Sequence, residues 1–367
     1  MRYAEADHLG ILIISVGKLT IYGYNIRAIY ENKTTYSAVR SWRKLCRYTK
    51  RGSKWQKISA MNWFIQKLNL TDVLSGLSLN TTSDNLEDIY MEIAEKAVHE
   101  NDYDKVKDEL EKRIYQYMSD YVIPDSPTVY DFLLLSLTSK DLAATFNWDP
   151  LLVQSYTRVM GYTNNLPELA FLHGNVAVGY CKDDNVMGNI AKPCKCGKPL
   201  TGVKLLYPIK KKNYQSEVAI SKSWKTLQNA LSVAYMVTIF GYSAPKSDVE
   251  AVAMLKTAWG SIDDRKLEEI EIIDLRPEDE VLDSWSEFIH THHYSYHKDF
   301  FDTTLGRCPR RSCEATFDRL MNCRFLDGSK GFKSNMDFAT IEAFVTPLID
   351  EEREKKLSKE MLSNPYI

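Results

Sequence analysis

Residues 141–160, "DLAATFNWDPLLVQSYTRVM", contain the pattern that decides the fold. A short apolar run ends in polar residues, and after Pro150 the chain continues with helical spacing. Such a run is typical of a buried strand, and the segment after it is typical of an amphipathic helix. Four further short apolar runs follow, and helix-like segments precede the first and the last of them: "ELAFLHGN" (168–175), "GVKLLYPI" (202–209), "LSVAYMVTIFGYSAP" (231–245) and "EEIEIIDLRP" (268–277). This alternation predicts an α/β fold with a doubly wound, mostly parallel, Rossmann-like sheet.

The composition excludes several classes of protein. The chain has 367 residues, 44% of them hydrophobic, and a formal net charge of −2, so no global positive field attracts nucleic acid. No apolar run approaches the roughly 20 residues of a membrane span. The start, "MRYAEADHLG", lacks the basic and apolar pattern of a signal peptide. Seven widely spread cysteines in a chain of this size do not predict a disulfide framework. We therefore expect a cytoplasmic protein.

The predicted organisation places one domain over residues 1–275. Residues 11–24, "ILIISVGKLTIYGY", predict a strand and turn, with a hairpin as one possibility. A helical insertion is expected over about 35–135, and a small loop subdomain containing cysteines over about 178–203. Residues 276–367 are expected to form a helix-and-loop extension.

Polar residues and glycines follow four of the apolar runs, at the point where each run ends. In open parallel sheets, ligands bind beyond the carboxyl ends of the strands, so these residues form the candidate site. The members are Asn147 and Asp149 after the first run, His173 and Gly174 after the second, Gly241, Tyr242 and Ser243 after the fourth, and Asp274 after the fifth.

These side chains have ordinary structural alternatives. Asn147 and Asp149 point to the same side of an extended chain, where they could bind ribose hydroxyls. They could equally cap the helix that follows Pro150. A neutral His173 could take a proton from a hydroxyl or a water, with Gly174 leaving room for the substrate, or it could simply bond the backbone at a strand end.

Three cysteines, Cys181, Cys194 and Cys196, lie in a loop rich in Gly, Pro and Lys. This composition suits a small zinc-held knuckle with little core of its own. A fourth ligand would have to be a histidine, a carboxylate or a distant cysteine. The alternative is a set of loop thiols left from a site that no longer binds metal.

Two further clusters have open interpretations. His290, His293 and His297 stand near helical spacing, which suits a metal face or, more commonly, an exposed or aromatic-packed face. The stretch "RCPRRSC", with Arg310 and Arg311, is a local basic patch. It could contact a phosphate or a partner subunit, or it could be solvated.

Taken in order, the motifs resemble the sirtuin-like (silent-information-regulator type) superfamily of NAD-consuming domains. The matching pieces are T-F-N-W-D-P (145–150), L-H-G-N (172–175), the cysteine loop, I-F-G-Y-S (239–243) and the closing strand before Asp274. The resemblance covers roughly residues 84–275. The N-W-D and G-Y-S-x-x-x-x-D versions look like the sirtuin-like domains of bacterial anti-phage systems rather than the histone-deacylating ones.

The resemblance implies a doubly wound NAD-binding domain that hydrolyses NAD+ to ADP-ribose and nicotinamide as an anti-phage effector. Regulation by assembly, as a homo-oligomer or with a partner protein, is expected with it. In this pattern His173 is the general base and Asn147 positions the ribose or an attacking water. The cofactor pocket would then be lined by Asp149, Gly174, Gly241, Tyr242 and Ser243, with Asp274 facing the adenosine ribose.

One departure from the family pattern leaves two alternatives open. The family's first strand leads into a G-A-G-x-S loop that cradles the pyrophosphate. Here "ILIISVGKLTIYGYN" supplies Gly17 and Gly23 but no paired glycines. A catalytically silent module that binds a nucleotide or a partner is therefore the second hypothesis. A NAD-dependent protein deacylase, which would need the zinc knuckle and a peptide cleft, is the third.

Overall fold

The structure is a computed structural model of the whole chain. It describes residues 9–14, 49–51, 54–56, 68, 70–74, 76–81, 86–207, 217–242, 249–260, 269–286, 288–289, 294–323 and 330–358. The expectations for Gly17, Gly23, Ser243, Asp248 (the last residue of the G-Y-S-x-x-x-x-D motif), His290 and His293 lie outside these residues.

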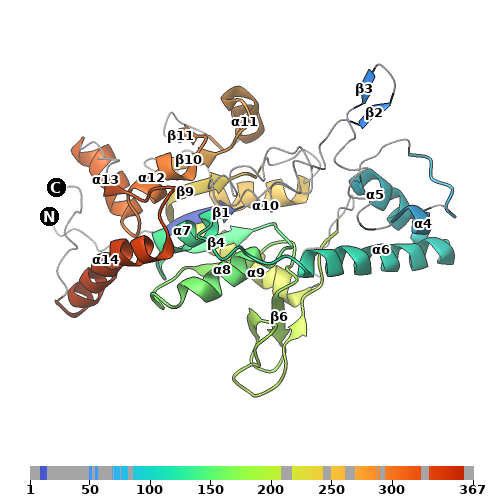
Figure 1. Cartoon of the computed structure of the whole chain (residues 1–367), viewed down its shortest axis with the longest axis horizontal. Coiled ribbons are helices and arrows are strands. Elements are labelled where there is room, and N and C mark those ends of the chain that lie inside the picture. The colour runs from blue at the N-terminus through green and yellow to red at the C-terminus, as the bar shows by residue number, and fades with distance from the viewer. Residues whose placement is uncertain are drawn as a thin grey trace.

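A six-stranded parallel sheet forms the centre of the molecule (Figure 1). Its strand order is β11-β10-β9-β1-β4-β5, and every neighbouring pair is parallel. In chain order the sheet reads 3-2-1-4-5-6, which is the order of the dinucleotide-binding doubly wound fold. The predicted fold class is thus confirmed. The strands are β1 (Leu9–Ile14), β4 (Leu142–Thr145), β5 (Glu168–Phe171), β9 (Ala234–Phe240), β10 (Glu269–Ile273) and β11 (Tyr294–His297).

Helices cover both faces of this sheet. Successive side chains of a strand point to opposite faces, yet every residue of β4, β9 and β10 is buried. Helices α9 and α10 pack on each other, with α9 against β5, β4 and β1, whereas α13 packs against β1 and β9. The surrounding helices are α7 (Val129–Ser136), α8 (Leu151–Val159), α9 (Val218–Leu231), α10 (Val249–Trp259), α11 (Glu278–Trp285), α12 (Thr304–Arg307), α13 (Ser312–Asn322) and α14 (Phe338–Ser358), with a 3-10 turn η1 (Phe300–Asp302).

β1 corrects the hairpin expectation for the N-terminal region. It is a central strand with β4 on one side and β9 on the other, both parallel to it. Both of its edges are therefore occupied, and no hairpin partner can pair with it. Within the expected helical insertion, the first described elements are instead two short antiparallel strands, β2 (Thr49–Arg51) and β3 (Lys54–Gln56).

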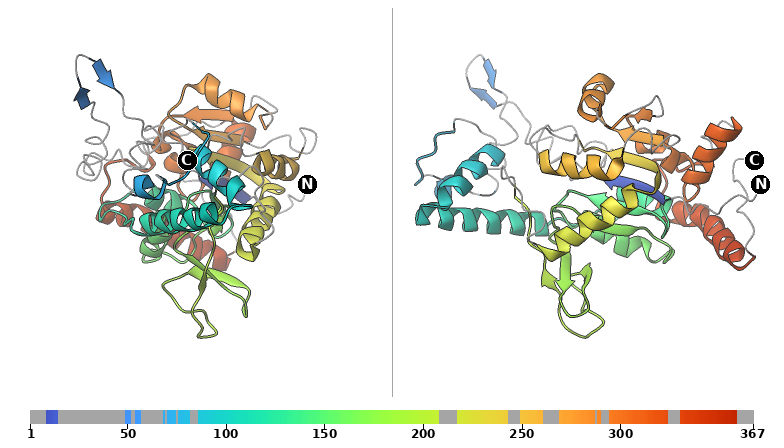
Figure 2. Two further views of the ribbon diagram at one scale, coloured as in Figure 1. Left: turned by 90° about the vertical axis from the view of Figure 1, so that its right-hand side faces the viewer. Right: turned by 180° about the vertical axis from the view of Figure 1, so that it is seen from behind.

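A helical arm projects from the sheet (Figures 1 and 2). It contains α4 (Leu70–Leu74), α5 (Leu86–Ala97) and α6 (Asn101–Ser119), all within the span of about 35–135 where a helical insertion was expected. The arm has an apolar core of its own, which includes Ile93, Leu110 and Ile114. Val176 and Leu205, from loops of the sheet domain, belong to the same core. The arm is thus packed directly onto the loops that follow β5.

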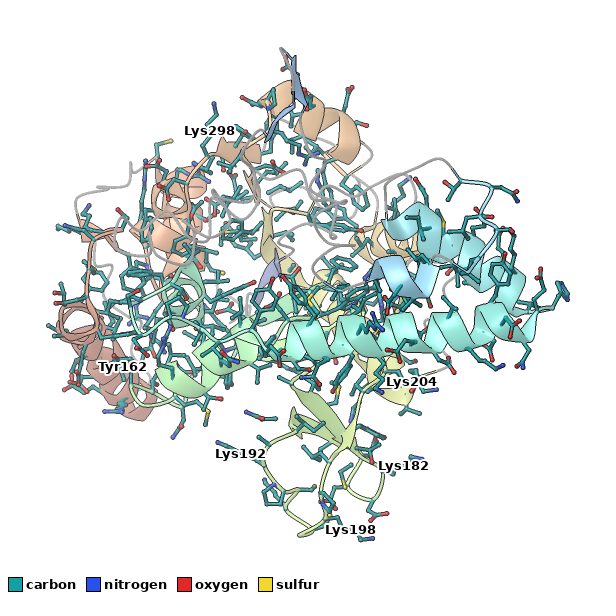
Figure 3. All side chains as sticks on the ribbon, turned by 45° about the vertical axis from the view of Figure 1, so that its right-hand side comes forward. Tyr162, Lys182, Lys192, Lys198, Lys204 and Lys298 are labelled. Atoms are coloured by element: carbon teal, nitrogen blue, oxygen red, sulfur yellow. The ribbon has the colours of Figure 1, made fainter. Side chains whose placement is uncertain are left out.

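A second projection, the cysteine finger (residues 178–202), leaves the sheet between β5 and α9 (Figures 1 and 2). It is a three-stranded antiparallel sheet of β6 (Val178–Cys181), β7 (Val186–Asn189) and β8 (Thr201–Gly202). Figure 3 shows Lys182, Lys192 and Lys198 around its outer end. The run at 202–209 was expected to be a strand of the main sheet, but among its described residues, 202–207, only Gly202 is in a strand, β8 of the finger.

The chain beyond residue 275 completes the sheet and its core. β11 is the sixth strand, so His297 is not part of a helical histidine face as the spacing suggested. Side chains of the last helices, such as Ile341 and Val345 of α14, share the core of the sheet. Described residues on both sides of the expected boundary at 275 thus contribute to one core, and the division into domains stays a prediction.

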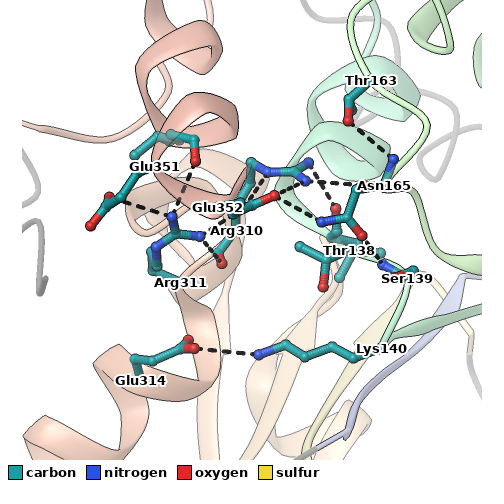
Figure 4. Close-up of polar contacts among 12 residues, drawn as sticks. Thr138, Ser139, Lys140, Thr163, Asn165, Arg310, Arg311, Glu314, Glu351 and Glu352 are labelled. Atoms are coloured by element: carbon teal, nitrogen blue, oxygen red, sulfur yellow. Dashed lines mark hydrogen bonds and ion pairs between the residues drawn. The ribbon is translucent and has the colours of Figure 1, made fainter. Parts of the chain in front are cut away.

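Arg310 and Arg311 are buried rather than solvated or facing a phosphate (Figure 4). Arg310 Nη2 lies 2.6 Å from Glu352 Oε2 and Arg311 Nη1 lies 2.8 Å from Glu352 Oε1. Arg310 also donates to the carbonyls of Leu137 and Asn165. The basic patch is thus an internal clamp that holds α14 against the loops before β4 and β5.

None of the helices in the described ranges is long and apolar enough to cross a membrane.

Candidate functional site

The candidate residues gather along one edge of the sheet because all six strands are parallel. Asn147 and Asp149 follow β4, His173 and Gly174 follow β5, Gly241 and Tyr242 follow β9, and Asp274 follows β10. The strand order reverses at β1, which lies between β4 and β9. Residues from β4, β5, β9 and β10 therefore surround the switch point of the sheet, where doubly wound folds bind ligands.

Asn147 is held by three hydrogen bonds. Its backbone N–H donates to Thr145 Oγ1 at 3.0 Å, and its carbonyl accepts from Asn175 Nδ2 at 3.2 Å. Its side-chain Nδ2 donates to the hydroxyl of Tyr130, a buried residue of α7, at 3.1 Å. Among the described residues, Asn147 Oδ1 has no hydrogen-bond partner. The amide is therefore oriented so that its acceptor oxygen is the atom left for a ligand.

Asp149 combines both interpretations that the sequence left open. Its Oδ1 accepts from the backbone N–H of Leu151 at 3.0 Å, so it does bond the first turn of α8. Burial raises the pKa of its carboxyl to about 6. A carboxyl that titrates close to neutral pH at a ligand-binding edge can both accept and donate hydrogen bonds.

His173 packs against a cluster of aromatic side chains at the carboxyl edge of the sheet. This cluster, Phe146, Trp224 and Tyr242, is called the aromatic floor. Its side chain is only 3% exposed, and its ring meets Phe146 edge to face at 4.9 Å. Phe146 in turn stacks on Tyr242 at 4.2 Å. Trp224 of α9 contacts Phe146 and donates from its indole N–H to the carbonyl of Leu172. The imidazole thus packs on Phe146, which in turn contacts rings from two further segments, in a largely dry environment.

Gly174 has a structural reason that the sequence did not indicate. Its φ of +78° favours glycine, and a Cβ at this position would lie 2.4 Å from the carbonyl oxygen of Lys204. The glycine allows the loop after β5 to pass close to the chain that returns from the cysteine finger. Its expected role in leaving room for a substrate stays a prediction.

Asn175 belongs to this constellation but was not among the predicted site residues. It is fully buried, and its amide bonds the carbonyls of both Asn147 and Asp149. Its place in L-H-G-N, directly after His173 and Gly174, was the one signal available.

Gly241, Tyr242 and Asp274 also lie at this edge. Gly241 has a φ of +65° and donates its N–H to the carbonyl of Ile273 at 2.9 Å. Asp274 is 4% exposed, and both of its carboxylate oxygens accept from the guanidinium of Arg276, at 2.6–3.2 Å. A ligand that uses Asp274 would therefore meet an aspartate–arginine pair rather than an isolated carboxylate.

The cysteine finger brings the three predicted ligands together with a fourth. The ligand atoms of Cys181, Asp184, Cys194 and Cys196 all lie within 4.8 Å of one another. The Sγ atoms of Cys181 and Cys196 are 3.6 Å apart, and Cys194 Sγ donates to Asp184 Oδ2 at 3.0 Å. Tetrahedral zinc with Zn–S bonds of ~2.3 Å places two sulfurs about 3.8 Å apart. The donor set fits zinc, with Asp184 as the carboxylate ligand that the sequence left unidentified.

Comparisons with known proteins give structural likeness at low identity. No protein-family model and no curated protein sequence matches the chain. Among the solved structures that match is a Sir2 homologue in complex with NAD, at 14% identity and a TM-score of 0.33, which covers 74% of this chain and 98% of that one. Another is a Sir2 homologue in complex with ADP-ribose, at 15% identity and a TM-score of 0.36, with 70% and 92% covered. A third is Sir2 with an inhibitor, 2′-O-acetyl-ADP-ribose and a deacetylated p53 peptide, at 13% identity and a TM-score of 0.34, with 71% and 98% covered. At this level of similarity, the geometry of the site has to carry any functional inference.

Proposed function

We propose that this chain is a sirtuin-like, NAD-consuming enzyme that hydrolyses NAD+ to ADP-ribose and nicotinamide. The observation that carries the proposal is the strand order 3-2-1-4-5-6, with Asn147 and His173 on adjacent strand ends beside the switch point. Dinucleotides bind at this place in doubly wound sheets. The sequence motifs T-F-N-W-D-P and L-H-G-N occupy the same two strand ends.

In the proposed reaction, Asn147 positions the ribose or the attacking water and His173 acts as the general base. Asn147 Oδ1 accepts a hydrogen bond from a ribose hydroxyl or from the attacking water, because its Nδ2 is bonded to Tyr130. His173, in its neutral form, takes the proton that this water loses. The glycosidic bond breaks, nicotinamide leaves with the bonding electron pair, and water adds to the oxocarbenium-like ribose. One NAD+ and one water give ADP-ribose, nicotinamide and one proton.

The aromatic floor suits this reaction. Phe146, Trp224 and Tyr242 limit access of bulk water to the base, so a placed water has fewer competitors. A low-polarity environment also strengthens each hydrogen bond made to the developing charge. The remaining proposed cofactor contacts are Asp149, Gly174, Gly241, Tyr242, Ser243 and Asp274.

Zinc in the cysteine finger would have a structural role. Cys181, Cys194, Cys196 and Asp184 would hold it, and it would supply the cross-link that a finger with few buried side chains lacks. Three thiolates and one carboxylate would complete a four-coordinate sphere, which leaves no open position for a substrate. The proposed hydrolysis uses no group of this finger.

Nicotinamide release from NAD+ by the purified full chain tests the proposal. We expect turnover that His173→Ala and Asn147→Ala each lower by at least about 100-fold. His99→Ala is the matched control, because His99 is an exposed histidine after α5. Wild-type turnover that persists unchanged in both site variants would refute the assignment.

A nucleotide-binding module without turnover is the second candidate. It is favoured by the sequence after the first strand, where "VGKLTIYGYN" lacks paired glycines. Calorimetry with NAD+ and ADP-ribose separates the two functions. Tight binding with no nicotinamide release would favour the module, and release of acetyl groups from acetyl-lysine peptides would favour a deacylase instead.

The biological setting that we propose is anti-phage defence, with activity controlled by assembly of copies or by a partner protein. Its support is the resemblance of N-W-D and G-Y-S-x-x-x-x-D to the sirtuin-like domains of such systems. Plaque counts on cells that express the chain with its genomic neighbours provide the test. Protection should require His173, and protection that survives His173→Ala would separate defence from the proposed chemistry.

A further inference from the structure

Asn175 uses its whole side-chain amide inside the protein. Its Nδ2 donates to the carbonyl of Asp149 at 2.6 Å and to the carbonyl of Asn147 at 3.2 Å. Its Oδ1 accepts from the backbone N–H of Ala177 at 2.9 Å. The residue is fully buried, so water does not compete for these groups. One side chain therefore bridges the two loops that follow β4 and β5.

The neighbouring backbone bonds extend this bridge. The N–H of Val176 donates to the carbonyl of Trp148 at 2.9 Å. The carbonyls of three consecutive residues, 147 to 149, are thus all bound by residues 175 and 176. Val176 is in turn held by the arm, because Tyr115 of α6 donates its hydroxyl to the Val176 carbonyl at 3.1 Å.

We propose that Asn175 is a positioning residue that sets Asn147 and His173 in one rigid unit. The proposal rests on the proposed function, in which these two side chains act on the same ribose and water. Asn175 itself contacts only the backbone of the site. Its loss would let the loop after β4 move relative to His173. A misplacement of about 1 Å at reacting groups can lower a rate by about 100-fold.

Asn165 provides a matched control. It is also an amide that bridges loops, with Oδ1 accepting from Ser139 N–H and Nδ2 donating to Glu352, but it lies before β5, away from the carboxyl edge. Asn175→Ala and Asn165→Ala each remove one bridging amide. Both are expected to lower Tm, so a fall in stability alone does not distinguish them.

Steady-state hydrolysis of NAD+ and calorimetry with ADP-ribose supply the distinguishing readouts. For Asn175→Ala we expect kcat to fall about 100-fold while KM and the Kd of ADP-ribose change less than about 3-fold. Asn165→Ala should keep kcat within about 3-fold of wild type. Similar kcat values for both variants would overturn the proposal. If Asn175→Ala does not fold, Asn175→Ser, which keeps one donor, replaces it. Its kcat should fall by a smaller factor, again with little change in KM or in the Kd of ADP-ribose. A kcat equal to that of the wild type would overturn the proposal.

Hydrogen exchange tests the Asn175 bridge without depending on catalytic activity. A wild-type protein that releases no nicotinamide would refute the hydrolase but not the bridge. In that case the amide of Val176, bonded to Trp148, reports on the bridge directly. We expect its exchange to quicken at least about 10-fold in Asn175→Ala and to stay unchanged in Asn165→Ala. Unchanged exchange in both variants would overturn the positioning role.

Discussion

The side-chain amide of Asn147 donates from Nδ2 to the hydroxyl of Tyr130 at 3.1 Å, and this bond holds the amide in place with Oδ1 at its other end. Tyr130→Phe removes the acceptor and lets the amide rotate. We expect kcat for NAD+ hydrolysis to fall about 10-fold, with a loss of stability of only about 1 kcal/mol, typical of one hydrogen bond. Tyr162→Phe, at a half-buried tyrosine beyond α8, should leave kcat unchanged (Figure 3). Equal rates in wild type and Tyr130→Phe would show that the amide needs no such orientation.

Asp149 makes stability depend on pH because burial raises the pKa of its carboxyl from 3.8 to about 6. A pKa raised in the folded state stabilises the protein at low pH, and that contribution is lost as pH rises through about 6. Asp149→Asn keeps an oxygen for the Leu151 N–H but cannot ionise. The variant should therefore gain stability relative to wild type between pH 4 and pH 7, by up to about 3 kcal/mol. Urea denaturation at a series of pH values measures the difference, and a constant difference would contradict the raised pKa.

The clamp between Arg310, Arg311 and Glu352 predicts a large effect from a single substitution. Glu352→Ala would leave the guanidinium of Arg310, whose side chain is 0% exposed, without its carboxylate. Removal of one partner from a buried ion pair costs about 3–5 kcal/mol. Glu354→Ala, at an exposed position on the same helix, should cost less than about 0.5 kcal/mol. Equal unfolding free energies for the two variants would rule out a clamp.

Gly174→Ala should destabilise the protein, because the new Cβ would lie 2.4 Å from the Lys204 carbonyl oxygen at a φ of +78°. We expect a loss of about 2–4 kcal/mol, of which about 1 kcal/mol comes from the backbone conformation. Gly197→Ala separates the two contributions, since Gly197 has a φ of +82° but open space around its Cβ position. It should lose only about 1 kcal/mol. The same loss in both variants would mean that the Lys204 contact is easily relieved.

The finger predicts one zinc ion per chain, measurable by elemental analysis of protein purified without chelator. Cys181→Ser and Asp184→Ala should each lower the zinc content by more than half, because each removes one of four ligands. Cys323→Ser is the control, since Cys323 is an exposed cysteine after α13. A stoichiometry near zero in the wild type would favour the alternative of loop thiols without metal.

Sequence patterns predicted the local elements well where the period of apolar residues was clear. The runs before Asn147, His173, Gly241 and Asp274 became β4, β5, β9 and β10, because each is short, apolar and ends in turn-forming residues. The run at 202–209 has the same composition but turns away to the core of the arm, where Leu205 packs. Composition alone does not say which core a buried segment joins.

The edge strand β11 is a strand of the main sheet that the sequence pattern did not predict. Its sequence, Y-S-Y-H, is only four residues long, so the spacing of nearby histidines suggested a helix instead. Parallel pairing with β10 decides its structure, as Ile270 pairs with Tyr294 and Ile273 with His297. Such pairing joins residues more than 20 positions apart, beyond the reach of local patterns.

The sequence by itself determined the α/β class, the strand ends that carry Asn147, Asp149 and His173, and three of the four finger ligands. These features follow from residue types at local spacings, which a linear reading can detect. Only the tertiary structure decided the strand order around β1, the bond that orients Asn147, the Asn175 bridge, the pairing of Asp274 with Arg276 and the place of Asp184 beside the three cysteines. The strand order depends on pairing between segments that are distant in the chain. The other features depend on where side chains point once the loops are packed, and a buried polar group without a partner costs too much free energy for most other arrangements.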